Sequence, residues 1–225
     1  MTLNDIYHAI DPVALSLGPL QIRWYGLAYV AGFICAFLVI AKLSQRWKIR
    51  IDDDAFFTVV FCVIFGVILG GRLGYVLVYG DGYYLQHPEK ILAFNEGGMS
   101  FHGGLVGVII GGVIAAKITK IPFLTLADMG VVGVPIGLFF GRCANFINGE
   151  LWGAPTDMPW GVVFGGAAGT MPRHPSQLYE ALLEGVVLFI ILFALSRKTP
   201  ARPRGTFFGT FLLFYGLFRF TIEFI

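Results

Sequence analysis

Charged residues are scarce in this chain of 225 residues, because 16 Lys and Arg and 14 Asp and Glu make up only 13% of it. Soluble domains carry about a quarter charged residues. The composition therefore excludes an ordinary cytosolic enzyme, and it is too apolar for a disordered chain. The three cysteines lack the spacing of a disulfide scaffold or a metal site, so we expect neither. With a net charge of +2 and no basic run interleaved with aromatics, we also expect no nucleic-acid partner.

Apolar residues are abundant, at 56%, and glycine adds 30 more residues. A helix of about 20 mostly apolar residues crosses the hydrocarbon core of a bilayer. We therefore predict an all-α fold, a polytopic helical membrane protein with six spans that form a single domain over residues 1–225. The predicted spans cover residues 24–41, 55–79, 99–116, 123–141, 177–196 and 206–225.

The basic residues between the spans predict the orientation of the chain. Lys and Arg are enriched in short cytoplasmic loops. Ten of the 16 basic residues follow the first, third and fifth spans, which places these loops in the cytoplasm and both termini outside. The ten are Lys42, Arg46, Lys48, Arg50, Lys117, Lys120, Arg197, Lys198, Arg202 and Arg204.

Glycines recur four residues apart in three of the predicted spans. In lipid, small residues at this spacing let two helix backbones approach closely. We therefore expect these glycines to form helix contact faces. The three sets are Gly66, Gly70 and Gly74; Gly103, Gly107 and Gly111; and Gly133, Gly137 and Gly141.

Polar residues gather at the predicted outer ends of several spans. A charge within a bilayer is costly unless it is paired or faces water, so such residues are candidates for function. Arg219 and Glu223, four residues apart, share one face of the last helix. The connection at 148–175, rich in Gly and Pro, is predicted to be an outer-face loop region. The remaining candidates on this side are Tyr25, His102, Arg142, Asn145, Glu150 and Tyr215.

A structural interpretation stays open for several of these residues. The pair of Arg219 and Glu223 is also typical of a helix-stabilising ion pair, and His102 of a packed, hydrogen-bonded histidine. Arg142 is also placed to reach lipid phosphate from the helix end. We expect capping roles for His174 and Glu180 at a helix entry, and for Asp128 on its own helix. Arg72 is a candidate structural partner of Glu180 or Glu184.

Five ordered motifs resemble the prolipoprotein diacylglyceryl transferase family. They are Ile22-Arg23-Trp24-Tyr25-Gly26-Leu27, Gly97-Gly98-Met99-Ser100-Phe101-His102-Gly103-Gly104, the polar stretch 141–153, His174-Pro175-Ser176-Gln177-Leu178-Tyr179-Glu180, and Tyr215-Gly216-Leu217-Phe218-Arg219-Phe220 with Glu223-Phe224. The resemblance implies an enzyme that moves the diacylglyceryl group of phosphatidylglycerol to the lipobox cysteine thiol of a bacterial preprolipoprotein. A thioether forms and glycerol phosphate is released, as the first step of lipoprotein maturation.

The resemblance further implies an inner-membrane protein with its active site on the periplasmic side and no cofactor. The family has a seventh span after the last motif, which we do not expect within these 225 residues. Guanidinium groups suit a phosphate, so Arg142 and Arg219 are the expected phosphate ligands. His102 is the expected base for the thiol. Residues at similar positions in the family imply that the substrate or the arginines are oriented by Tyr25, Asn145, Glu150, Tyr215 and Glu223.

Two rival functions belong to other classes of protein. A transporter or channel needs polar residues at several depths of the membrane, whereas these cluster at one face. A lipid-binding protein without catalysis would need the arginines but not His102. Modification of a lipobox peptide distinguishes all three.

Overall fold

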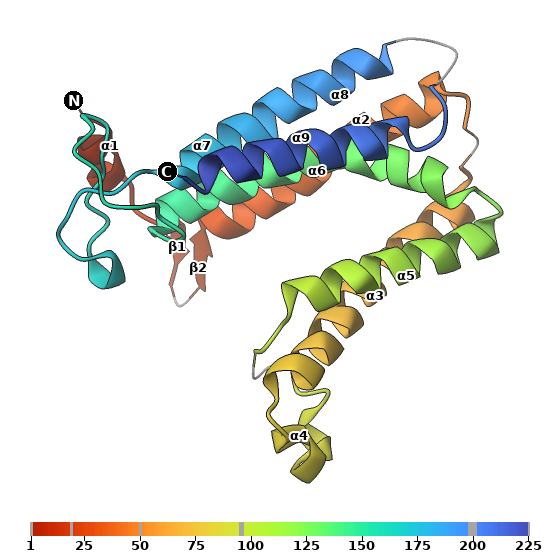
Figure 1. Cartoon of the computed structure of the whole chain (residues 1–225), viewed down its shortest axis with the longest axis horizontal. Helices are drawn as coiled ribbons and strands as arrows, with labels where there is room; N and C mark the ends of the chain where they lie inside the picture. The colour runs from red at the N-terminus through yellow and green to blue at the C-terminus, as the bar shows by residue number, and fades with distance from the viewer. Residues whose placement is uncertain (1, 19, 50, 95–96, 198–201, 225) are drawn as a thin grey trace. The chain divides into compact units, whose positions relative to one another are not determined.

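The computed structural model describes residues 2–18, 20–49, 51–94, 97–197 and 202–224 (Figure 1). The chain divides into two compact units. The first comprises Met1–Lys48 and Asp128–Ile225, and the second Ile49–Ala127. Three residues of the sequence predictions, Arg50, Lys198 and Ile225, lie outside the described residues.

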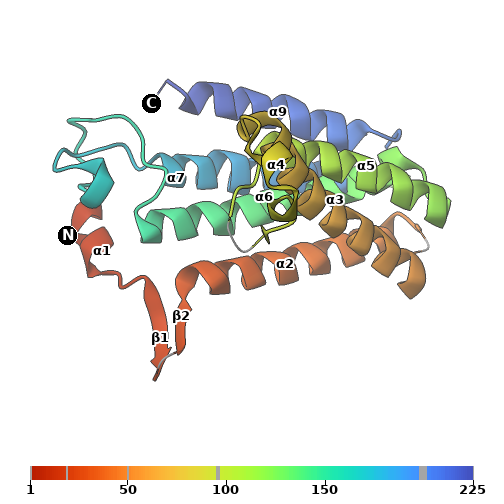
Figure 2. The ribbon, with the colours of Figure 1, turned by 90° about the horizontal axis from the view of Figure 1, so that it is seen from below.

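The first unit is a bundle of long apolar helices. It contains α2 (Trp24–Arg46), α6 (Phe123–Asn148, apart from its first turn) and α9 (Thr206–Ile222). A further continuous helix comprises α7 (Ser176–Glu180), the π-helical stretch Ala181–Val187 and α8 (Leu188–Ser196). These helices run side by side in both ribbon views (Figures 1 and 2). The predicted span at 123–141 forms the first part of α6. This helix continues to Asn148 and therefore also carries Arg142 and Asn145.

Glycines set the distance between α2 and α6. A Cβ added to Gly32 would lie 3.6 Å from the Cα of Gly137, and one added to Gly133 would lie 3.2 Å from the Cβ of Ala36. The two helices therefore run antiparallel in close contact. Beside them, α8 and α9 complete a buried core formed by Leu43, Val131, Val132, Leu188, Leu192 and Phe207.

Asp128 joins α6 to the start of α9. The N-cap residue of α9 is Gly205, which has no side chain to cap the helix. The buried carboxylate of Asp128 instead accepts hydrogen bonds from the backbone N–H of Gly205, at 2.7 Å, and of Phe208, at 2.8 Å. The expectation that Asp128 caps its own helix is wrong, because tertiary packing brings it to the positive end of another helix.

The second unit is built on the antiparallel pair of α3 (Asp53–Tyr79) and α5 (Phe101–Thr119), with the short helices α4 (Tyr83–Gln86) and Pro88–Lys90 between them. A Cβ on Gly70 would lie 2.8 Å from the Cα of Gly107, and one on Gly74 would lie 2.7 Å from the Cα of Gly103. The backbones thus touch along the first two glycine sets, as predicted. In the third set Gly133 packs against α2, but a Cβ on Gly141 would meet no heavy atom within 4 Å among the described residues.

The structure confirms a polytopic helical membrane protein. Among the described residues, five helices are long and apolar enough to span a bilayer: α2, α3, α5, α6 and the continuous helix Ser176–Ser196. The sixth predicted span forms α9, which is apolar but has 17 residues, so the count of six stays a prediction. Three N-terminal elements were not predicted: helix α1 (Leu3–Ala9) and the antiparallel strands β1 (Val13–Leu17) and β2 (Leu20–Arg23).

Candidate active site

Two arginines from separate helices meet at one buried carboxylate in the first unit. Arg142 lies near the end of α6, Arg219 near the end of α9, and Glu180 at the end of α7. Glu180 Oε2 lies 2.6 Å from Arg142 Nε, and Glu180 Oε1 lies 2.9 Å from Arg219 Nη1. The Glu180 side chain is only 6% exposed, whereas those of Arg142 and Arg219 are 21% and 42% exposed. The carboxylate thus holds both guanidiniums together from the protein side and leaves part of each accessible.

The central role of Glu180 was missed from the sequence. A capping role was expected, because Glu180 stands near a helix entry. Arg142 and Arg219 are 38 and 39 residues away along the chain, so no helical spacing could reveal the contact. The expected pairing of Arg72 with Glu180 or Glu184 is wrong, because Arg72 donates to backbone carbonyls of its own unit.

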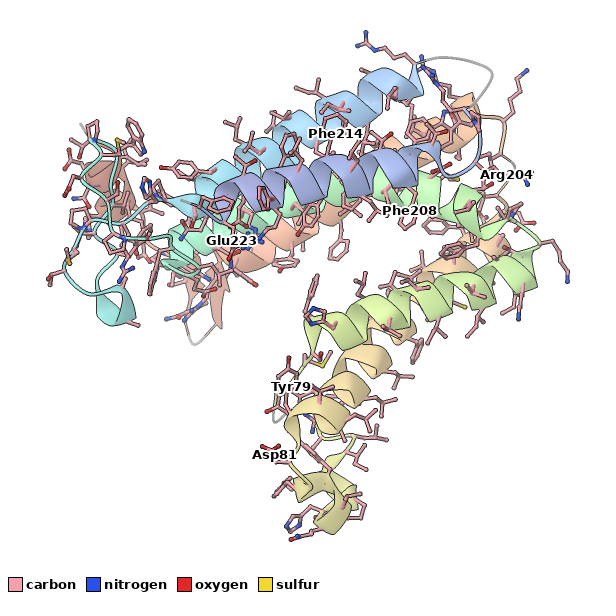
Figure 3. All side chains as sticks on the ribbon, viewed as in Figure 1. Tyr79, Asp81, Arg204, Phe208, Phe214 and Glu223 are labelled. Carbon is pink, nitrogen blue, oxygen red and sulfur yellow. The ribbon has the colours of Figure 1, made fainter. Side chains whose placement is uncertain are left out.

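Arg219 also pairs with Glu223, as their spacing predicted. Arg219 Nη2 lies 3.1 Å from Glu223 Oε2, and the Glu223 side chain is 68% exposed. Figure 3 shows Glu223 at the opposite end of α9 from Arg204. One turn earlier, Tyr215 is half-buried and stacks on Phe211 at 5.4 Å between ring centroids. The structure therefore joins Arg142, Arg219 and Glu223 through ion pairs, and Tyr215 lies one turn before Arg219 on α9.

Asn145 and Glu150 lie where α6 turns into the following loop. The amide nitrogens of Asn145 and Asn148 lie 3.3 and 3.2 Å from the Glu150 carboxylate. Gln177, which is fully buried at the start of α7, donates from Nε2 to the Glu150 backbone carbonyl at 2.5 Å. This contact fixes the turn after α6 against the helix that carries Glu180.

The predicted loop region 148–175 is held by its own contacts. Arg173 donates from Nε to the Ala168 carbonyl at 2.9 Å, and its guanidinium lies 4.2 Å from the centre of the Trp152 ring. At the re-entry into α7, Tyr179 accepts a hydrogen bond from Trp160 Nε1 at 2.6 Å and lies 3.1 Å from His174 Nδ1. His174 thus pairs with a side chain instead of capping α7.

Helix α1 packs under the same loop. Tyr7 contacts Phe146 of α6 and Phe164 of the loop edge to face, with ring centroids 5.5 and 5.0 Å apart. This burial raises the pKa of the Tyr7 phenol. The Asn4 side chain accepts from the Val163 backbone N–H at 2.9 Å. The N-terminal segment therefore stabilises the loop beside the arginine pair.

Tyr25 lies in the first turn of α2 and is half-buried. Its hydroxyl is 3.2 Å from that of Tyr29, and the two rings lie 4.9 Å apart. Among the described residues, no hydrogen bond or ion pair joins Tyr25 to either arginine. Its predicted role in substrate binding stays a prediction.

His102 belongs to the second unit, where it is exposed at the start of α5. Ser100 caps this helix by accepting from the Gly103 N–H at 3.2 Å. The segment before it is held by buried Arg72, whose guanidinium donates to the carbonyls of Lys90, Ile91, Gly97 and Gly98. Within the described residues the His102 imidazole makes no hydrogen bond or ion pair. Its position relative to the arginine pair stays a prediction.

The paired arginines suit an anion with several oxygens. Each guanidinium has five N–H donors in a planar fork and stays charged at any ordinary pH. Glu180 occupies part of this set, and the outer part remains accessible to a ligand. A phosphate diester held there would receive charge-assisted hydrogen bonds from two helices at once.

The chain matches known proteins over nearly its full length. The model of the family described as prolipoprotein diacylglyceryl transferase matches residues 12–225. A relative from Geobacter sulfurreducens, named phosphatidylglycerol–prolipoprotein diacylglyceryl transferase, is 55% identical over 215 residues, which cover 96% of this chain and 82% of the relative. Relatives of the same name from Cupriavidus metallidurans and Desulfotalea psychrophila are 51% and 50% identical. They match 97% and 95% of this chain and 82% and 80% of their own lengths.

Proposed function

The chain belongs to the prolipoprotein diacylglyceryl transferase family, and we propose that it transfers the diacylglyceryl group of phosphatidylglycerol to the lipobox cysteine of a preprolipoprotein. The sulfur–carbon bond forms as the bond between the glyceryl carbon and the phosphate oxygen breaks. Glycerol phosphate leaves, and a thioether remains on the protein substrate. Family membership supports the reaction, and the meeting of Arg142 and Arg219 at Glu180 supports the place where the phosphate binds.

Arg142 and Arg219 hold the phosphate of the lipid in this proposal. Negative charge grows on the phosphate as its bond to carbon breaks, so fixed positive donors stabilise the transition state more than the bound substrate. Glu180 keeps the two guanidiniums together before the lipid arrives. Such preorganised charge is a large source of catalysis in water-poor sites.

His102 accepts the thiol proton. The thiolate is the nucleophile, and an ordinary thiol is mostly protonated at neutral pH, so a nearby base raises the fraction that reacts. Imidazole titrates in this range. Its exposure at the start of α5, with no hydrogen bond or ion pair to its imidazole within the described residues, supports this role.

The remaining polar residues orient the substrates or the arginines. Glu223 pairs with Arg219 from the exposed side, where a lipid headgroup can compete with it. Asn145 and Glu150 offer polar groups at the turn beside Arg142. Tyr25 and Tyr215 stand in the first turn of α2 and the second half of α9 and have hydroxyls suited to a glycerol headgroup.

We assign the site to the periplasmic side of a bacterial inner membrane. Lys42 and Arg46 end α2, Arg197 follows α8 and Arg204 precedes α9, so these basic residues mark one end of the first unit. The arginine pair marks the opposite end, as Arg204 and Glu223 illustrate on α9 (Figure 3). Basic loops favour the cytoplasm, which supports a site that faces outward.

Mass spectrometry of a lipobox peptide tests the function. The peptide is incubated with the protein in phosphatidylglycerol vesicles, and we expect its cysteine to gain the mass of one diacylglyceryl group. A peptide with Cys replaced by Ser is the matched control and should gain nothing. An unmodified Cys peptide would favour a transporter or a lipid-binding protein. Full transfer by the His102→Gln variant would refute the role of His102 as the base while leaving the function intact.

A further inference from the structure

Glu184 is a buried carboxyl group that the proposed mechanism does not use. Its side chain is fully buried, and neither carboxyl oxygen has a hydrogen-bond partner among the described residues. It lies four residues after Glu180, within the π-helical stretch Ala181–Val187. Short π-helical segments inside α-helices are frequent at functional sites.

The neighbouring helices enclose Glu184. At the next residue, Gly185, an added Cβ would lie 2.7 Å from the Cβ of Phe139 and 3.0 Å from its Cα, so α6 packs directly against this turn. Among the described residues, the ionisable groups near enough to act electrostatically on Glu184 are Glu180 on its own helix, Arg142 on α6, and Arg219 and Tyr215 on α9. Both arginines are already engaged by Glu180.

A carboxylate in this position has no direct compensation for its charge. A buried ionised carboxylate without a partner is strongly unfavourable, and such groups bind a proton instead. Glu180, only one turn away, adds like-charge repulsion, which further favours a single negative charge on the pair. The geometry therefore points to Glu180 as the ionised member and Glu184 as the protonated one.

The protonated state matters for the charge of the site. Arg142 and Arg219 contribute two positive charges, and Glu180 and the exposed Glu223 contribute two negative charges. With Glu184 neutral, the cluster carries no net charge, and an incoming phosphate needs only to displace Glu223 from Arg219. With Glu184 ionised, the cluster would be negative before the phosphate arrived, in a region where charges are weakly screened.

We propose that Glu184 is a positioning residue: its carboxyl group stays protonated and neutral next to Glu180, so that the arginine pair remains able to bind the phosphate of the lipid. This inference rests on the proposed function. It assigns to Glu184 an effect on phosphate binding that acts through Glu180 and the arginines, without contact to the substrate.

The pH dependence of KM for phosphatidylglycerol tests this role in the intact protein. Between about pH 6 and about pH 9, where a buried carboxyl group loses its proton, KM of the native protein should rise about tenfold. In Glu184→Gln, which cannot ionise, KM should stay within about twofold over the same range. Glu89→Gln, at an exposed residue of the second unit, is the matched control and should keep the native rise. Equal pH dependence in the native and Glu184→Gln proteins would overturn the proposal.

Infrared spectroscopy gives a readout that needs no activity. The carbonyl stretching band of a protonated carboxylic acid should be present in the native protein and in Glu89→Gln at neutral pH, and absent in Glu184→Gln. A native protein without this band would refute the protonated state even if KM behaved as expected. If the native protein transfers nothing to the lipobox peptide but shows the band, the proposed function and the inferred effect on KM both fail, while the buried proton stands.

Discussion

Replacing Glu180 by Gln removes the charge that Arg142 and Arg219 share. A Gln side chain can accept from one guanidinium through its oxygen, but its NH2 group repels the other. Removing one partner from a buried ion pair costs about 3 to 5 kcal/mol. Because Arg142 and Arg219 are 21% and 42% exposed and can turn toward water, we expect a smaller loss of stability, of about 2 kcal/mol.

The same change should reduce activity more than stability alone would suggest. Once one arginine leaves its position, the phosphate loses a fixed donor, and misplacement by about 1 Å lowers rates by about 100-fold. We expect kcat/KM for the lipobox peptide to fall by that factor. For the loss of stability, the matched control is Glu223→Gln, because Glu223 is 68% exposed and its pair with Arg219 contributes less than about 1 kcal/mol.

Thermal unfolding in detergent and peptide modification followed by mass spectrometry measure the two effects. If Glu180→Gln unfolds at the native temperature and retains kcat/KM within about threefold, then Glu180 does not organise the arginines. The same conclusion follows if Glu223→Gln destabilises the protein as much as Glu180→Gln does.

Two further predictions test the packing that supports the site. Asp128→Ala should lower the free energy of unfolding by about 2 kcal/mol, because α9 loses its N-cap acceptor and a negative charge at its positive end. Asp128→Asn keeps an acceptor, so its loss of stability should be about half as large. Chemical denaturation measures both losses. Gly107→Ala should destabilise the second unit by more than about 1 kcal/mol, because its Cβ would collide with the Gly66 carbonyl. A Cβ on Gly130 would meet no heavy atom within 4 Å from the rest of the described structure, beyond its own stretch of helix, so Gly130→Ala should be tolerated in thermal unfolding.

Local patterns predicted the helices well. The uncharged run that begins at Trp24 correctly predicted the first residue of α2. The preceding strand β2 ends at Arg23. The four-residue spacing of Gly66, Gly70 and Gly74 predicted the contact of α3 with α5, because small residues at this spacing leave a groove on one helix face. The spacing of Arg219 and Glu223 likewise predicted their ion pair.

Contacts between distant segments were the part that sequence could not supply. A capping role was predicted for Glu180 because the sequence shows only its neighbours along the chain. Its actual role depends on how α6 and α9 pack against α7. Arg72 was a candidate partner of Glu180 or Glu184, but its guanidinium donates instead to the backbone carbonyls of Lys90 and Ile91. In both cases the tertiary fold, and not the local sequence, determines which partner the charged side chain contacts.

Release of glycerol phosphate from phosphatidylglycerol vesicles tests the arginine pair most directly. In the presence of lipobox peptide, the native protein should release one glycerol phosphate for each modified cysteine. Arg142→Ala and Arg219→Ala should each lower the rate at least about 100-fold, a typical cost of losing a charged donor to the transition state. Arg204→Ala, at the opposite end of α9 from the site, should release glycerol phosphate at the native rate. Unchanged release by either of the first two variants would contradict the assignment of these arginines to the phosphate.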